Sequence, residues 1–148
     1  MNTRFFEKLE LNKVLAQCAN FAVLSSAKQM IAEEVPSSDL KEVRERLART
    51  QEADILLFRF GASGVEYFDD VTDLLSRAEK GSTLSCAELM HVNALNRSAR
   101  IAQTSVFSFA GEEIIFIKAD CARLYYDARL EDDINFAILS DGEINDHA

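Results

Sequence analysis

The longest uninterrupted pattern in this sequence is helical and runs from residue 39 to residue 60. Apolar side chains recur there at steps of three and four, which places them on one face of an α-helix. Neither proline nor glycine interrupts the stretch. A helix of that length is about 33 Å long, enough to cross a whole domain. The residues that share this face are Leu40, Val43, Leu47, Thr50, Ala53, Leu57 and Phe60.

Residues that break helices are also rare in the rest of the chain. The 148 residues include one proline and five glycines, whereas an all-β sandwich needs a turn roughly every 8–12 residues. The sequence therefore predicts an all-α fold, a bundle of six to eight helices that forms a single helical domain over residues 1–148. Besides 39–60, helices are predicted at about 11–22, 25–34, 69–80, 85–103 and 130–139, with an earlier turn at 3–9. Periodicity alone does not separate a buried helix from a hairpin over residues 106–117, where a helix at about 112–124 is favoured.

Polar residues and glycines indicate where these helices begin and end. A capping box, in which two side chains satisfy each other's free backbone N–H groups, is predicted at Ser85 with Glu88 and at Asp39 with Glu42. Single N-cap residues are predicted at Asn12, at Ser25 or Ser26, and at Asp69 or Asp70. Left-handed residues that end helices are predicted at Gly61 and Gly81.

The charge of the chain is −9 and is unevenly distributed. Residues 112–148 contain ten acids and three bases, a net charge of −7, so any surface that faces an anion must lie in the first three quarters. Most bases there are paired with acids at i,i+4, as in Glu42 with Arg46 and Glu45 with Arg49. At most a weak nucleic-acid contact is expected, from one or two of Lys41, Arg44, Arg97 and Arg100.

No catalytic, cofactor-binding or metal-binding residues are expected in the chain. The string Lys80-Gly81-Ser82 reverses the order that a phosphate-binding Walker A loop requires. The two histidines, His91 and His147, have no partners at ligand spacing. Four acids could form a cation site but lack the spacing of a calcium loop, so a solvated helix start is the favoured interpretation. These acids are Asp127, Glu131, Asp132 and Asp133.

The cysteines and the N-terminal residues indicate a compartment. Cys18, Cys86 and Cys121 show no CxxC spacing, which favours three small buried thiols in a reducing environment. The first residues contain no long apolar run, so neither a signal peptide nor a membrane span is expected. These features predict a cytoplasmic protein with no membrane partner.

Five segments, in order, resemble one bacterial family. Residues 77–89, Arg-Ala-Glu-Lys-Gly-Ser-Thr-Leu-Ser-Cys-Ala-Glu-Leu, resemble the stretch "R-A-E-K-G-x-L-S-x-x-E-L" of the MutS-two family, the MutS paralogues that lack the mismatch-reading domain. Residues 6–15 resemble its opening "L-E-x-L-E-F-D-K-I-L". The other matching segments are 36–43, 50–53 and 130–144, which resemble "P-S-x-D-L-x-E-V", "T-x-E-A" and "L-E-x-x-I-x-x-x-I…D-G-E-I".

The resemblance implies that the chain is the first part of a MutS-like core domain, cut before the long lever helices. In this family the ATPase, with bound ATP and Mg, and a small Smr nuclease-type domain lie beyond residue 148. The chain itself would then be a non-catalytic scaffold that transmits nucleotide state to the clamp. The resemblance further implies a homodimeric parent that acts on branched DNA or on stalled ribosomes. The partners of the chain would be the lever, the clamp and the ATPase.

Two other functions stay open on the sequence. The chain could be a stand-alone helical interaction module, whose acidic last quarter docks on a basic partner. It could also be an enzyme with an unrecognised acid site, which would need a pocket with converging acids. The order of the matching segments favours the scaffold over both alternatives.

Overall fold

The computed structural model describes residues 9–60, 66–109, 113–139 and 143–146, except the side chains of 59 and 60. These ranges contain seven helices and no strand, apart from one isolated antiparallel bridge between Ile138 and Ile144. The predicted all-α fold is therefore confirmed. The helices are α2 (Leu11–Ala19), α3 (Ser25–Ala32), α4 (Leu40–Phe60), α5 (Thr72–Glu79), α6 (Cys86–Ser108), α7 (Phe116–Cys121) and α8 (Ala128–Ala137).

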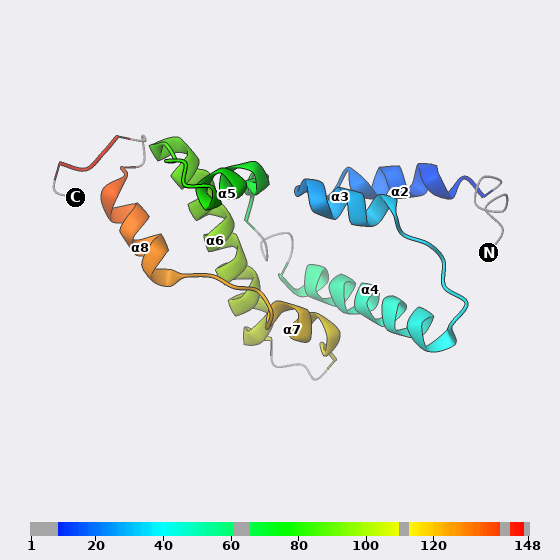
Figure 1. Ribbon diagram of the computed structural model, residues 1–148. Coiled ribbons are helices and arrows are strands. Elements are labelled where there is room, and N and C mark those ends of the chain that lie inside the picture. Colours follow the sequence, from blue (N-terminus) through cyan, green and yellow to red (C-terminus); the bar gives the residue numbers. More distant parts are fainter. Residues whose placement is uncertain (1–8, 61–65, 110–112, 140–142, 147–148) are drawn as a thin grey trace.

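The helices form two groups that meet at α7 (Figure 1). In the first group α2 packs on α3, and α4 runs below them as the longest helix of that end. In the second group α6 is the central helix, and both α7 and α8 pack against it. The main helix-to-helix contact between the groups is made by α4 with α7.

A cluster of buried apolar side chains lies at this junction. Val106, Ile114 and Cys121 are buried together, and side chains from α4, α6 and α7 pack against them. The side chains that cover the cluster are Ile55, Leu56, Phe109 and Ile117. Within α2, α3 and α5, by contrast, no side chain is buried. The core is therefore small for the length of the chain, and much of the apolar surface stays exposed.

The best-marked predicted helix ends are confirmed. The Ser85 side chain accepts the backbone N–H of Glu88, while the Glu88 carboxylate accepts the backbone N–H of Ser85 at 2.8 Å. That backbone N–H, together with Arg77 and the Ser85 hydroxyl, lowers the pKa of Glu88 to about 2. Gly81 has a φ of 85°, the left-handed conformation that ends α5. Both features depend on neighbouring residues only, which is why sequence can predict them.

Replacing Ser85 by alanine is expected to lower the free energy of unfolding by about 1 kcal/mol, because the first turn of α6 loses its side-chain acceptor. Chemical denaturation followed by circular dichroism measures the change. Ser76→Ala is the matched control, since Ser76 lies exposed within α5. Equal midpoints for the Ser85→Ala chain and the parent chain would contradict the assigned cap.

Three other predicted caps differ from the structure, although the helices begin close to the predicted positions. Asn12 does not cap α2, because the helix begins at Leu11 after Glu10, whose φ of 54° is left-handed. Ser25 is the first residue of α3 rather than its cap, and its backbone N–H is accepted by the carboxylate of Asp70, 2.6 Å away. Asp39 caps α4 as predicted, but Glu42 bonds to Ser37 instead of closing the box.

The second half differs from prediction mainly in helix length. α6 continues to Ser108, five residues past the predicted end, and α8 begins after the cap Asp127 rather than at 130. The helix predicted at 112–124 is reduced to the short α7. The predicted turn at 3–9 lies almost wholly outside the described residues, and Gly61 lies outside them.

The cysteines differ from the expectation of three buried thiols. Cys121 is buried, and burial raises its pKa, whereas Cys86 is half-buried and Cys18 is exposed. Cys18 lies on α2, in which no side chain is buried among the described residues. Across the described ranges, no helix combines the length and apolar character that crossing a membrane would require.

Candidate functional site

One face of α6 carries polar side chains that hold the segments around it. Asn93, Asn96, Arg100 and Gln103 follow one another at steps of three and four, so they share a face. Each bonds to the chain between α7 and α8 or to α8 itself. We call these four residues the polar face of α6. The helical period of the apolar residues does not reveal this face, because its four members are polar.

The central contact of the polar face is an ion pair between Arg100 and Glu131 of α8. Two nitrogens of the guanidinium donate to the two carboxylate oxygens, each at 2.8 Å. Glu131 is only 7% exposed. The hydrogen bonds from Arg100 lower the pKa of Glu131, although burial acts in the opposite direction. The carboxylate is therefore ionised and oriented toward α6.

Two other members of the polar face, Asn96 and Gln103, bond to backbone at the end of α7 and between α7 and α8. Asn96 exchanges two hydrogen bonds of 2.8 Å with the backbone of Asp127, immediately before α8. The Gln103 amide donates to the carbonyls of Cys121 and Leu124, at 2.9 and 3.2 Å. Because a buried backbone group needs a partner, these amides fix the path of the connection from α7 to α8.

A second set of polar contacts, made by the carboxylate of Glu52, connects α4 to α7. This carboxylate accepts the backbone N–H groups of Ile115, Phe116 and Ile117 at 3.0, 3.1 and 2.8 Å. Burial of Glu52, which is 5% exposed, opposes ionisation, but the three donors outweigh it and lower the pKa. Arg49, one turn earlier, pairs with Asp120 and lies 5.2 Å from the ring centroid of Phe116.

A third carboxylate joins two helix starts. Asp70 accepts the hydroxyl and backbone N–H of Thr72 at the start of α5, and the backbone N–H of Ser25 at the start of α3. The Thr72 hydroxyl, followed by the Ser25 donors, lowers the pKa of Asp70 well below its usual range. Glu131, Glu52 and Asp70 thus each connect parts of the chain that are far apart in sequence.

The structure divides the four predicted nucleic-acid contacts into two pairs. Lys41 and Arg44 are exposed on α4 and make no ion pair with any described residue. Arg97 donates to Glu66 at 2.7 Å, and Arg100 is engaged with Glu131. Contact of these four bases with nucleic acid stays a prediction.

The acid cluster is not a uniformly solvated helix start, so that expectation is wrong. Asp127 caps α8 by accepting the backbone N–H groups of Arg129 and Leu130. Glu131 is buried, whereas Asp132 and Asp133 are exposed. Among the described residues no three His, Cys, Asp or Glu side chains gather in a way that could hold a metal ion. His91 faces Asp69 at 2.7 Å, and His147 lies outside the described residues.

The geometry defines a class of protein: a helical segment with polar joints, much exposed apolar surface and, in the part described, no converging catalytic groups. No protein-family model matches the chain. Its sequence is 35% identical over 150 residues to "Endonuclease MutS2" of Clostridium botulinum (strain Alaska E43 / Type E3). It is 34% identical over 149 residues to the protein of that name from Clostridium acetobutylicum, and 31% over 150 residues to that of Clostridioides difficile (strain 630).

Each alignment includes 100% of this chain but 19% of the relative, so the chain spans about a fifth of the length of these curated relatives. Their agreement over the whole chain identifies it as a segment of the MutS2 family. The family resemblance of the sequence is thereby confirmed.

Proposed function

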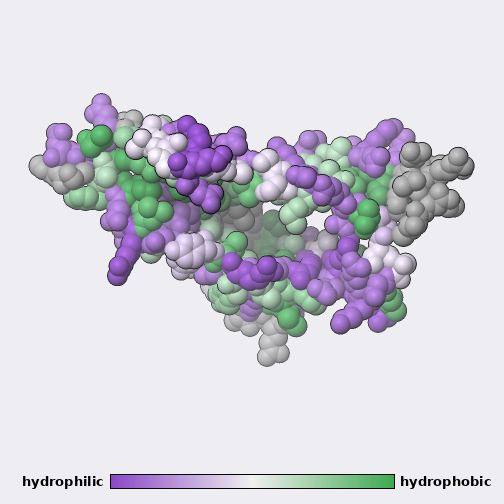
Figure 2. All heavy atoms as spheres, in the orientation of Figure 1, coloured by the Kyte–Doolittle hydropathy of each residue, from purple (hydrophilic) through white to green (hydrophobic). Residues whose placement is uncertain are grey.

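We propose that the chain is a non-catalytic helical scaffold segment of a longer MutS-like ATPase. The single observation that carries the proposal is the shortage of core. Phe21 and Phe58 are each 90% exposed, and Met30 is 72% exposed. Phenylalanine and methionine side chains are usually buried in a folded protein. Figure 2 shows apolar side chains among polar ones at both ends of the visible face. Exposed apolar surface of this extent is typical of a segment that packs against further protein.

In this proposal the segment transmits the nucleotide state of the ATPase to the clamp that grips nucleic acid. ATP and Mg bind elsewhere in a homodimeric parent, and the target is branched DNA or a stalled ribosome. The succession of contacts from α4 through α7 to α6 and α8 supports the role, because packed elements shift as units rather than bending continuously.

The test uses the complete reading frame from which this sequence comes. We expect it to continue into a Walker A motif, and we expect saturable ATP binding by the complete protein but not by the 148-residue chain. Isothermal titration calorimetry of both proteins measures this. A reading frame that stops after Ala148, or micromolar ATP binding by the short chain, would contradict the proposal.

One observation favours the alternative of a stand-alone acidic module. Asp132 and Asp133 are exposed on α8 and form no ion pair with any described residue. Such a surface suits a basic partner. A natural stop after Ala148, together with salt-sensitive binding to a basic peptide that Asp132→Asn/Asp133→Asn abolishes, would favour the module over the scaffold.

The 148-residue chain is expected to bind nucleic acid more weakly than about 10⁻⁴ M at physiological salt, because its charge is −9 and two of four candidate bases are engaged with acids. Labelled duplex and branched DNA, titrated at about 50 and about 200 mM salt, measure the affinity and its salt dependence. Lys41→Glu with Arg44→Glu tests the two unpaired bases, and Lys28→Glu on α3 is the control. Tight, steeply salt-dependent binding that the double reversal removes would make α4 a direct contact surface instead.

A further inference from the structure

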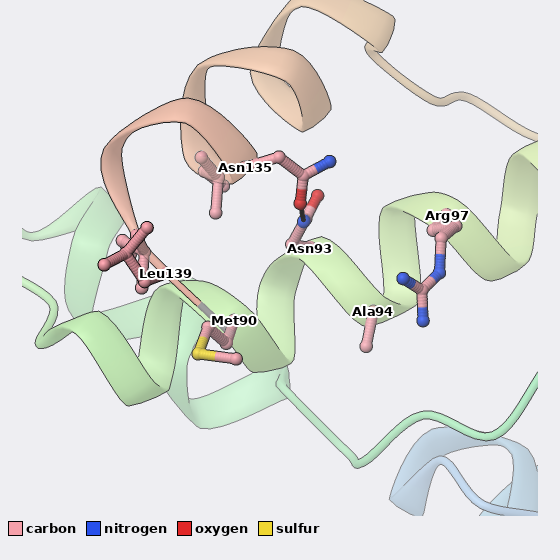
Figure 3. Close-up of a pocket in the computed structure, with 8 residues that line it drawn as sticks. Met90, Asn93, Ala94, Arg97, Asn135 and Leu139 are labelled. Atoms are coloured by element: carbon pink, nitrogen blue, oxygen red, sulfur yellow. Dashed lines mark hydrogen bonds between the residues drawn. The ribbon is translucent and has the colours of Figure 1, made fainter. Parts of the chain in front are cut away.

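A cavity of about 410 Å³ lies between α6 and α8. Met90, Ile138 and Leu139 supply apolar walls, while Asn93 and Asn135 supply amides. Figure 3 shows the two amides pointing toward one another from their helices, with Met90 and Leu139 farther along the same groove. A hollow of this size is comparable to the pockets that take a ligand or a large side chain.

One of these amides is incompletely bonded. Asn93 is 7% exposed, and its Nδ2 donates to Oδ1 of Asn135 at 2.9 Å. Its Oδ1 is buried and has no partner among the described residues. Turning both amides over would leave Nδ2 of Asn93 unpartnered instead, so the orientation does not remove the deficit. A buried polar atom without a partner is costly. Asn93 lines the cavity, so an occupant that fits this cavity would supply both apolar side chains and a hydrogen-bond donor.

The chain after α8 returns to the edge of this cavity. Leu139 donates its backbone N–H to Glu143 at 2.8 Å, and Asn145 donates its own to Ala137 at 2.9 Å. An antiparallel bridge pairs Ile138 with Ile144 between these two hydrogen bonds. Residues 143–146 therefore run antiparallel to the end of α8, next to two residues that line the cavity. These residues lie at the rim of the cavity.

We propose that this cavity is the docking site for the stretch that follows residue 148 in the longer protein. That stretch inserts an apolar side chain between α6 and α8 and gives Asn93 its missing hydrogen-bond partner. The inference rests on the proposed function, because it requires a longer chain. A tethered segment that starts at the rim has a high local concentration there, which favours it over a second copy or a separate protein.

Photo-crosslinking of the complete protein tests the occupant. p-Benzoylphenylalanine replaces Leu139 at the cavity, or Arg129 on the exposed surface of α8 as the control. We expect mass spectrometry to find a crosslink from position 139 to a peptide beyond residue 148 of the same chain, with a yield that does not depend on protein concentration. Crosslinks only to a second copy or to another protein, or a yield no higher than at position 129, would overturn the inference.

A stability comparison gives an independent readout. Asn93→Leu removes the incompletely bonded amide, so its effect should differ between the two lengths of chain. We expect the melting temperature of the complete protein to fall by about 4 °C more than that of the 148-residue chain, while Asn12→Leu on exposed α2 shifts neither. Equal shifts at both lengths would overturn the inference. A reading frame that stops at 148 refutes the proposed function as well, whereas a continuing frame with equal shifts refutes the inference alone.

Discussion

Replacing Glu52 by glutamine is expected to lower the free energy of unfolding by about 3 kcal/mol. The glutamine oxygen can still accept the N–H groups of Ile115 and Phe116, but its amide nitrogen then faces the N–H of Ile117, so two donors meet. The variant also loses the charge that strengthens all three bonds. A buried N–H group without an acceptor, here that of Ile117, costs more free energy than an ordinary hydrogen bond contributes.

Urea denaturation followed by circular dichroism measures the change, and Asp54→Asn is the control, because Asp54 is an exposed acid on the same helix. The pH dependence gives a second check. The folded-state pKa of Glu52 is lowered, so its contribution is fully present above the pKa of an unfolded glutamate and is lost as pH falls through the folded value. As the pH falls below the lowered pKa of Glu52 in the folded state, the stability of the parent chain should therefore approach that of Glu52→Gln. A constant difference between the two at all pH values would contradict this assignment.

Arg100→Leu is expected to lower the free energy of unfolding by about 2–3 kcal/mol, because it leaves the carboxylate of Glu131 buried without its partner. This loss of stability is smaller than the loss expected when a fully buried ion pair is broken, because the Arg100 side chain is 35% exposed. Arg97→Leu is the matched control, three residues away on α6, since both side chains of its ion pair are more than 40% exposed.

The double variant Arg100→Leu/Glu131→Leu separates charge from packing. It removes both charges together, so it should recover most of the stability that Arg100→Leu loses. Thermal and urea denaturation of the parent chain, Arg100→Leu, Glu131→Leu and the double variant complete a double-mutant cycle. If Arg100→Leu were no more destabilising than Arg97→Leu, the ion pair between Arg100 and Glu131 would not stabilise the packing of α6 against α8.

Features encoded by neighbouring residues could be predicted from the sequence. The Ser85 capping box, the left-handed Gly81 and the bounds of α4 each depend on a few adjacent positions. Features that depend on distant residues could not be predicted. Arg100 was expected to contact phosphate, because no local pattern shows that Glu131 lies opposite it in the fold.

The shortness of α7 also depends on a distant residue and could not be predicted. Its sequence carries apolar residues from Ile114 onward, which predicts a longer helix. Glu52 accepts the backbone donors of residues 115–117 and so sets where the helix starts. The position of that carboxylate is fixed by α4, far away in sequence. A periodicity confined to one segment contains no information about it.

The joint between α4 and α7 also has a consequence for the order of folding during synthesis. Glu52 is 63 residues before Ile115, its first donor. At about 5–20 residues per second, a ribosome takes about 3–13 s to add that stretch. For this time α4 has left the ribosome's active site without the buried partner of its carboxylate. The chain therefore acquires its central core only after α7 has been made, and until then the side chains of α4 that cover this core stay exposed.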